Sequence, residues 1–181
     1  AQGHWPWTRD KLAKLVDNLF AYGVVGIGWD MLFAERDESA DIDRLHRMAV
    51  AKGDESFIAT LEEFEPQLDR DLIFAESLAT GPNVLGFFFD TNESTAYETG
   101  ELPVPAFDFD ESMADSIFLP RGKGFSSNRP ELMAAAYSAG FINNPLIDED
   151  GVVRRAPLLH EYKFSAYEAL SLATAAAFRN E

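Results

Sequence analysis

Two carboxylates at the ends of expected strands are the residues best placed to do chemistry in this chain. Asp30 follows the apolar run 24–29, and Asp90 follows the apolar run 84–89. A carboxyl group at a strand end can lie in a cleft, where it is suited to general acid catalysis or to binding a positive group. The chain has 31 acidic residues, however, and such a residue more often caps a helix or a turn.

Two adjacent arginines give a second candidate polar site. Arg154 and Arg155 alternate faces on an expected strand, so one of them should point inward and need a buried carboxylate partner. Asp30 is the expected partner, because a carboxylate can accept two hydrogen bonds from a guanidinium. The pair is either structural or one wall of a ligand pocket, and Asn143 completes this set of candidate ligand-binding residues.

The motifs of common catalytic and cofactor sites are each incomplete in this sequence. Gly26-Ile27-Gly28 lacks the third glycine of a dinucleotide fingerprint. Gly122-Lys123-Gly124 lacks the leading glycine and the Ser or Thr of a phosphate loop. Ser126-Ser127 has no Gly-x-Ser-x-Gly frame. We therefore expect no catalytic residue and no cofactor.

Metal binding is not indicated either. The three histidines, His4, His46 and His160, lie in unrelated segments without ligand spacing. Asp148, Asp150 and Gly151 give only a fragment of a calcium loop, and its expected flanks are strands rather than helices. A plain hairpin turn is the favoured interpretation of this fragment.

Composition and charge narrow the class of protein. The 181 residues are 46% hydrophobic and suffice for one domain with a substantial core. The formal net charge of −16 disfavours nucleic acid and anionic membrane surfaces as partners. The absence of cysteine excludes disulfides and thiolate chemistry. No apolar run approaches the ~20 residues of a membrane span.

The elements that would position these residues predict an α/β fold. A helix should begin after Thr8 and end near Gly23, and buried strands are expected over 24–29 and 83–89. The long connection between the strands, helical and interrupted at Pro66, implies parallel pairing. Residues 91–129 should form an ordered loop region with a short strand or two.

The C-terminal third is expected to complete the sheet. A helix should start at Pro130, a hairpin should span 141–159, and a closing helix should run from about Ser165 to Arg179. The overall prediction is a single α/β domain with a mixed, twisted sheet and helices on both faces.

Several stretches, taken in order, resemble one known family. They are Trp5-Pro6-Trp7-Thr8-Arg9, the run 25–33, the segments 69–78 and 83–86, the prolines near Leu102, and above all 139–143 with 148–158 and 166–170. Gly-Phe-x-Asn followed by Asp-x-Asp-Gly-Val-x-Arg and Pro-Leu is the most specific of them. The chain resembles the CHASE2 family of bacterial receptors, and it departs from that family between Glu35 and Gln67, where it is longer than the usual connection.

The resemblance implies a role rather than a chemistry. CHASE2 domains are extracytoplasmic sensors, so we expect a location on the outer, periplasmic side of the bacterial cytoplasmic membrane. The chain would be a domain cut from a larger receptor, with flanking membrane helices and a histidine kinase, nucleotide cyclase, diguanylate cyclase or Ser/Thr kinase as output. Its partner would be a small-molecule or protein stimulus, and a homodimer remains open.

Two alternatives remain open at this point. One is a hydrolase or transferase that uses Asp30 and Asp90 in a cleft. The other is a dimerisation module that binds no ligand and shows a large apolar interface.

Overall fold

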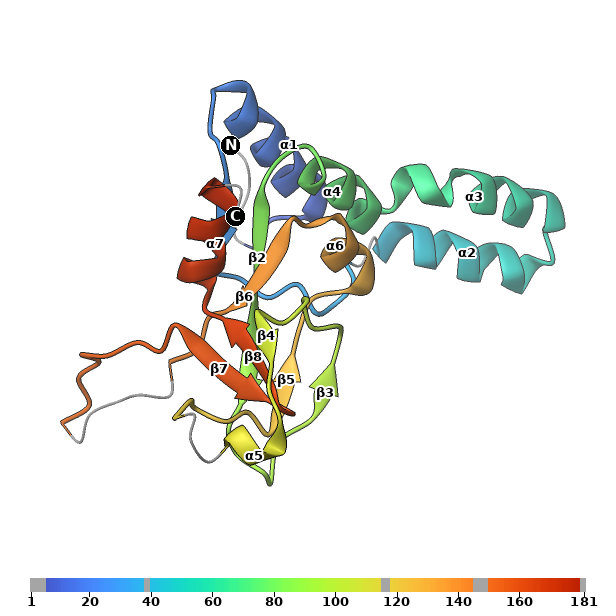
Figure 1. Ribbon diagram of the computed structural model, residues 1–181. Coiled ribbons are helices and arrows are strands. Elements are labelled where there is room, and N and C mark those ends of the chain that lie inside the picture. Colours follow the sequence, from blue (N-terminus) through green and yellow to red (C-terminus); the bar gives the residue numbers. More distant parts are fainter. Residues whose placement is uncertain (1–5, 38–39, 115–117, 145–149, 180–181) are drawn as a thin grey trace.

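The computed structural model describes residues 6–37, 40–114, 118–144 and 150–179 (Figure 1). The helices are α1 Arg9–Ala21, α2 Ala40–Lys52, α3 Glu55–Leu68, α4 Arg70–Leu78, α5 Glu111–Ala114, α6 Pro130–Ala135 and α7 Leu170–Arg179. The strands are β1 Ile27–Trp29, β2 Asn83–Asp90, β3 Glu98–Thr99, β4 Phe107–Asp108, β5 Gly124–Ser126, β6 Ser138–Phe141, β7 Leu159–Tyr162 and β8 Ser165–Glu168. Within these ranges, no helix combines the length and the apolar character that crossing a bilayer requires.

Strand β2 is the centre of a mixed five-stranded sheet. Its first half pairs in parallel with β1 on one edge and with β6 on the other. Its second half pairs antiparallel with β5, which in turn pairs with β3. Nearly every side chain of β2 is buried, as expected for a strand covered on both faces. The predicted parallel pairing of the two apolar runs is confirmed, although the first strand is shorter than 24–29.

Helices cover both faces of this sheet (Figure 1). Val84 packs with Ala173 and Ala177 of α7 on one face. The next residue, Leu85, joins a larger apolar cluster with Leu12 of α1 and Phe74 of α4 on the other face. Neighbouring residues of a strand point to opposite faces, so this alternation places α7 opposite α1 and α4. The predicted α/β architecture is confirmed.

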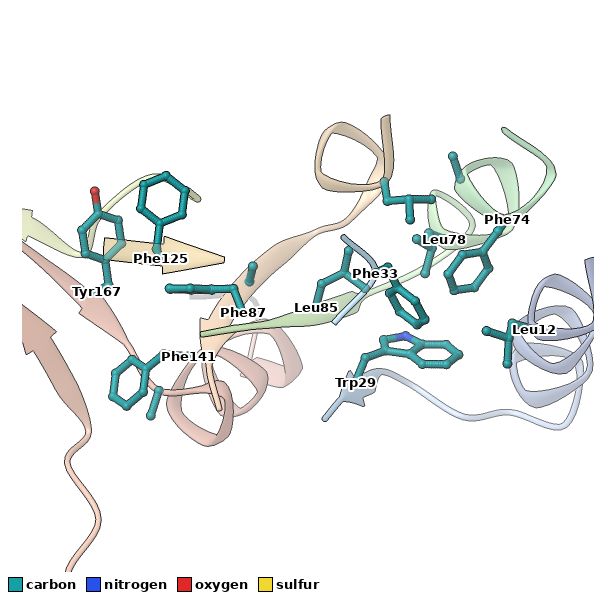
Figure 2. Packing of buried hydrophobic residues seen from close by; sticks show 14 of the residues in the cluster. Leu12, Trp29, Phe33, Phe74, Leu78, Leu85, Phe87, Phe125, Phe141 and Tyr167 are labelled. Carbon is teal, nitrogen blue, oxygen red and sulfur yellow. The ribbon is translucent and has the colours of Figure 1, made fainter. Parts of the chain in front are cut away.

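An aromatic cluster fixes β1 against α4 (Figure 2). Trp29, Phe33 and Phe74 meet edge to face, with ring centroids 5.2–5.8 Å apart. The indole Nε1 of Trp29 donates to the amide oxygen of the buried Asn83 over 3.0 Å. Such edge-to-face pairs add about 0.5–1.5 kcal/mol each beyond the area they bury.

A second, three-stranded sheet is built from β4, β8 and β7, in that order. It packs on the end of β2 through Phe89, whose ring stacks on His160 at 4.6 Å between centroids and meets Tyr162 and Tyr167. The predicted hairpin over 141–159 is therefore wrong. Residues 152–158 form no strand, and β7 instead pairs with β8.

The turn between β7 and β8 explains this error. Its central residues, Lys163 and Phe164, have φ values of 50° and 64°. Turns of this kind favour Gly, Asn or Asp, so Lys-Phe gives no turn signal in the sequence. For the same reason the closing helix, expected from Ser165, begins only at Leu170, after β8.

Candidate functional site

A cavity of about 430 Å³ opens where parallel strands β1 and β6 end and helix α7 begins. In open α/β sheets, ligands bind outside the carboxyl ends of the strands. The described residues that line the cavity are Gly28, Asp30, Phe141, Ile142, Asn143, Asn144, Ala156, Pro157, Ala169, Leu170, Ser171 and Thr174. Most of this lining is apolar, with a few polar groups, which is typical of small-molecule sites.

Two glycines allow α7 to lie close to the sheet at the floor of the cavity. A Cβ atom on Gly28 would stand 2.8 Å from Oγ1 of Thr174, and one on Gly140 would stand 2.5 Å from the Cα atom of Leu170. The sequence pattern Gly26-Ile27-Gly28, which does not form a dinucleotide fingerprint, therefore serves helix packing. The Oγ1 atom of Thr174 is closed from solvent and has no hydrogen-bond partner among the described residues.

Asn143 shapes the β6 side of the cavity by continuing the strand pairing. Its side-chain Oδ1 accepts from the backbone N–H of Phe89, and its Nδ2 donates to the carbonyl of Phe89, both over 2.9 Å. The amide thus satisfies the backbone of β2 where β6 has ended. Asn143 was predicted to bind ligand, and the structure places it in the cavity wall with much of its hydrogen-bonding capacity already used.

Asp30 is the only residue of the described lining with an ionisable side chain. It follows β1 directly and is exposed to solvent. No hydrogen bond or ion pair engages it within the described residues. Its carboxylate is therefore available to a ligand.

The segment that follows the turn at Gly151 forms the remaining side of the cavity. Ala156 and Pro157 line the cavity, and the side chain of Asn144 donates from Nδ2 to the carbonyl of Arg155 over 2.7 Å. This bond ties the segment to the end of β6.

The predicted buried pair between Asp30 and an inward arginine is not formed. Asp30, Arg154 and Arg155 are all exposed, and Arg154 pairs with Asp150, Nη2 to Oδ2, over 2.8 Å. This hydrogen bond holds the pKa of the Asp150 carboxyl below its usual value. The reason for the error is that 152–158 is not a strand, so the alternation of faces does not apply. Of the four candidate residues, Asp30 and Asn143 are brought together at the cavity.

Comparison with known families gives a match over the full length of the chain. A family model described as the CHASE2 domain matches residues 1–181, the whole chain.

The chain belongs to the CHASE2 family.

CHASE2 domains are extracytoplasmic sensor domains of signalling receptors, so the resemblance seen in the sequence motifs is confirmed. No curated protein and no solved structure matches this CHASE2 domain.

The second strand-end carboxylate of this CHASE2 domain has a local role. Asp90 accepts from the backbone N–H of Asn92 over 2.8 Å and from the hydroxyl of Thr95 over 3.0 Å. It does not line the cavity that contains Asp30. The structure thus gives Asp90 the turn role that was the more frequent expectation, and the two carboxylates do not converge as a hydrolase would need.

The remaining sequence candidates fall outside the cavity or outside the described residues. His46 is exposed on α2, and His160 is buried in the aromatic core. Ser127 is buried, and Asp150 engages Arg154. His4 and Asp148 lie outside the described residues. No group of three or more potential metal ligands occurs in the part of the chain that the structure describes.

Sequence reasoning missed the contribution of α7. Ser171 and Thr174 both line the cavity, and their spacing of i and i+3 puts them on one face of the helix. The sequence does show two hydroxyl residues on one face of an otherwise alanine-rich helix, a pattern that could have indicated a polar site. The pattern was missed because the helix was expected to begin at Ser165.

Proposed function

We propose that this CHASE2 domain receives a small ligand in the cavity between β1, β6 and α7. The observation that carries the proposal is the cavity itself, which lies at the carboxyl ends of two parallel strands and holds the carboxylate of Asp30, unengaged by any described residue. Its volume of about 430 Å³ falls within the range of small-molecule sites.

The lining favours a ligand with a positively charged or neutral polar group. Asp30 would pair with an amine or guanidinium, and the net charge of −16 would attract cations and repel anions at long range. Ile142, Pro157 and Leu170 offer an apolar surface for the rest of the molecule. A small organic amine fits this combination better than a carboxylate or a phosphate.

Binding would act on the arrangement of α7. The cavity is bounded by strand ends on one side and by the first turns of α7 on the other, so a ligand that contacts both would favour one position of the helix. A differential affinity worth about 1–3 kcal/mol is enough for such coupling. Helices α1 and α7, the first and last in the element order, are the elements that would pass the change on.

The receptor that carries this domain would place it outside the cytoplasmic membrane. Membrane helices on either side would hold the domain there, and the response would be made by a kinase or cyclase module inside the cell. The family to which the chain belongs supports this arrangement.

Ligand binding can be tested on the 181-residue chain. A panel of small aliphatic and aromatic amines, with matched carboxylates, is screened by thermal shift and followed by calorimetry. We expect amines to raise the melting temperature, and Asp30→Asn to weaken their binding about tenfold or more. Asp17→Asn, an exposed carboxylate on α1, is the matched control and should change nothing. No stabilisation by any amine, or equal binding to Asp30→Asn, would overturn the proposal.

A further inference from the structure

Helices α2 and α3 form a hairpin that projects from the body of the domain (Figure 1). They pack on each other, and α3 meets α4 at the base of the hairpin. None of their described side chains belongs to the two buried apolar clusters, and Ala49 is the only one of them that is buried. The hairpin is therefore not needed to build the core.

The hairpin nevertheless carries an apolar stripe that the described residues cover only in part. Its members are Leu45 and Met48 on α2 and Phe57 and Phe64 on α3, and each is between 40% and 48% exposed. The first two are spaced i, i+3 and the last two i, i+7, so each pair lies along one face of its helix. Long apolar side chains at this spacing are typical of a helix packed against another helix.

The described charged side chains of the hairpin differ in sign between its two helices. The described charged residues of α2 are the cations Arg44, Arg47 and Lys52, and those of α3 are the anions Glu55, Glu62 and Glu63. No ion pair engages any of these six side chains within the described residues. Within the described residues, the hairpin thus presents three cations on α2 and three anions on α3 that no ion pair engages.

We propose that the apolar stripe docks a second copy of this chain, hairpin against hairpin, to form a four-helix bundle. Two hairpins placed side by side, with their tips at the same end of the bundle, can alternate α2 and α3 around it, so that each α2 lies between its own α3 and the α3 of the partner. The alternative with α2 against α2 would oppose like charges. The hairpin surface is complementary to itself, as a two-fold interface requires.

The register of the turn specifies one contact of this bundle. Arg44 precedes Gly53 by as many residues as Glu63 follows Asp54, so the two lie at the same height above the tip. Arg44 lies one turn before Met48 on the same face of α2. Glu63 directly precedes Phe64 on α3, so it lies to the side of the apolar stripe rather than on it. Arg44 of one copy therefore lies opposite the partner's Glu63 in the arrangement with both tips at the same end.

The cations of α2 give a second copy of this acidic chain a place to bind. Two chains of charge −16 repel each other overall, but Arg44, Arg47 and Lys52 of α2 offer opposite charge to the anions on α3 of another copy. The helices are about 20 Å long, which gives an interface near the lower end of the specific range, roughly 1,200 Å². We expect a dimer with a micromolar dissociation constant.

Charge reversal tests the proposed contact. The dissociation constant is measured by sedimentation equilibrium on the 181-residue chain, from about 10 μM to about 1 mM. Arg44→Glu and Glu63→Arg should each raise it about tenfold or more, and the double variant, whose net charge equals that of the parent, should restore it to within about threefold. Lys14→Glu on α1 makes the same charge change as Arg44→Glu at another exposed site and is the matched control. The substituted side chains are exposed, so the circular dichroism spectrum should not change.

Crosslinking gives a second, independent readout. The chain has no cysteine, so Met48→Cys introduces a single thiol. A short bis-maleimide should crosslink Met48→Cys into dimers and leave Val104→Cys, a more exposed site outside the hairpin, monomeric. A chain that stays monomeric at all concentrations, a double charge reversal that fails to recover the dimer, or equal crosslinking of the two cysteine variants would each overturn the proposal.

The test of the dimer is independent of the test of ligand binding. The hairpin residues lie outside the lining of the cavity, so the hairpin variants should retain amine binding, and Asp30→Asn should retain the dimer.

Discussion

Arg9 of α1 and Asp71 of α4 form an ion pair in which Nε donates to Oδ1 over 3.2 Å. The Asp71 side chain is 1% exposed, and its other oxygen accepts from the backbone N–H of Asp37 over 2.9 Å. The Nε atom of Arg129, just before α6, lies 3.6 Å from the same oxygen. The guanidinium of Arg9 also lies over the ring of Phe33. One buried carboxylate therefore joins the first helix to three later segments of the chain.

We predict that Asp71→Asn destabilises the domain by about 3 kcal/mol, because it removes the buried negative partner of two half-buried arginines, Arg9 and Arg129. Urea unfolding followed by circular dichroism measures this change. Asp17→Asn, exposed on α1, serves as the control and should stay within about 0.5 kcal/mol of the parent. A loss below about 1 kcal/mol for Asp71→Asn would show that the network contributes little.

Acid should weaken the domain through His160. This side chain is buried against Phe89 and Phe141, and the burial lowers its pKa. The unfolded chain therefore binds a proton near pH 6.5 that the folded chain does not yet take up. The free energy of unfolding should fall as the pH falls below about 6.5, by at most about 1.4 kcal/mol per pH unit, and level off below the lowered pKa.

A variant isolates this contribution from that of the carboxylates. His160→Phe keeps an aromatic ring in the same place and should reduce the difference in the free energy of unfolding between pH 7.5 and pH 5. His46→Gln, on the exposed face of α2, should leave this difference unchanged. If the free energy of unfolding falls with pH equally in His160→Phe and in the parent, the acid sensitivity comes from other groups.

The close approach of α7 to β1 predicts a rescue. Gly28→Ala should cost about 1–3 kcal/mol, because its Cβ atom would stand 2.8 Å from Oγ1 and 3.3 Å from Cγ2 of Thr174. Adding Thr174→Ala removes both atoms and should recover most of the loss. Gly140→Ala makes the matched contrast, since its Cβ atom would meet the backbone of Leu170, and Thr174→Ala should not rescue it. If the losses in the free energy of unfolding from Gly28→Ala and Thr174→Ala simply add in the double variant, the proposed contact is contradicted.

The amide of Asn143 should protect the end of β2. Asn143→Ala leaves the backbone N–H and carbonyl of Phe89 without their side-chain partner, at a cost of about 2 kcal/mol. Hydrogen exchange of the Phe89 amide should accelerate more than that of its neighbours. Asn144→Ala, which loses an exposed bond to Arg155, is the control and should leave this amide protected.

The sequence predicted the elements whose signals are local. Leu12 and Val16 recur at helical spacing and are buried in α1, and Gly23, at φ of 89°, follows the end of that helix as expected. The apolar run ending at Asp90 is the buried central strand β2. Asp30 was identified as a strand-end carboxylate, and it lies in the wall of the cavity.

The features that depend on the tertiary structure were not predictable in the same way. The β7–β8 hairpin turns at Lys163 and Phe164, where packing of Phe164 on Phe109 compensates for an unfavourable backbone conformation. Because the sequence does not signal that turn, the prediction places the residues of β8 in the last helix and the arginines after Gly151 in a strand. Thr174 lines the site only because Gly28 lets α7 approach, which is a contact between residues far apart in the sequence.

The two ends of the α2–α3 hairpin are joined at its base, since Arg36 pairs with Asp69 over 3.2 Å and the N–H of Asp37 donates to Asp71. A protrusion that starts and finishes at one point can be excised, lengthened or exchanged without rerouting the strands beneath it. Evolution could thus reshape the outer surface of the domain while leaving the sheet and its cavity intact, and a protein engineer could transplant the hairpin between related domains.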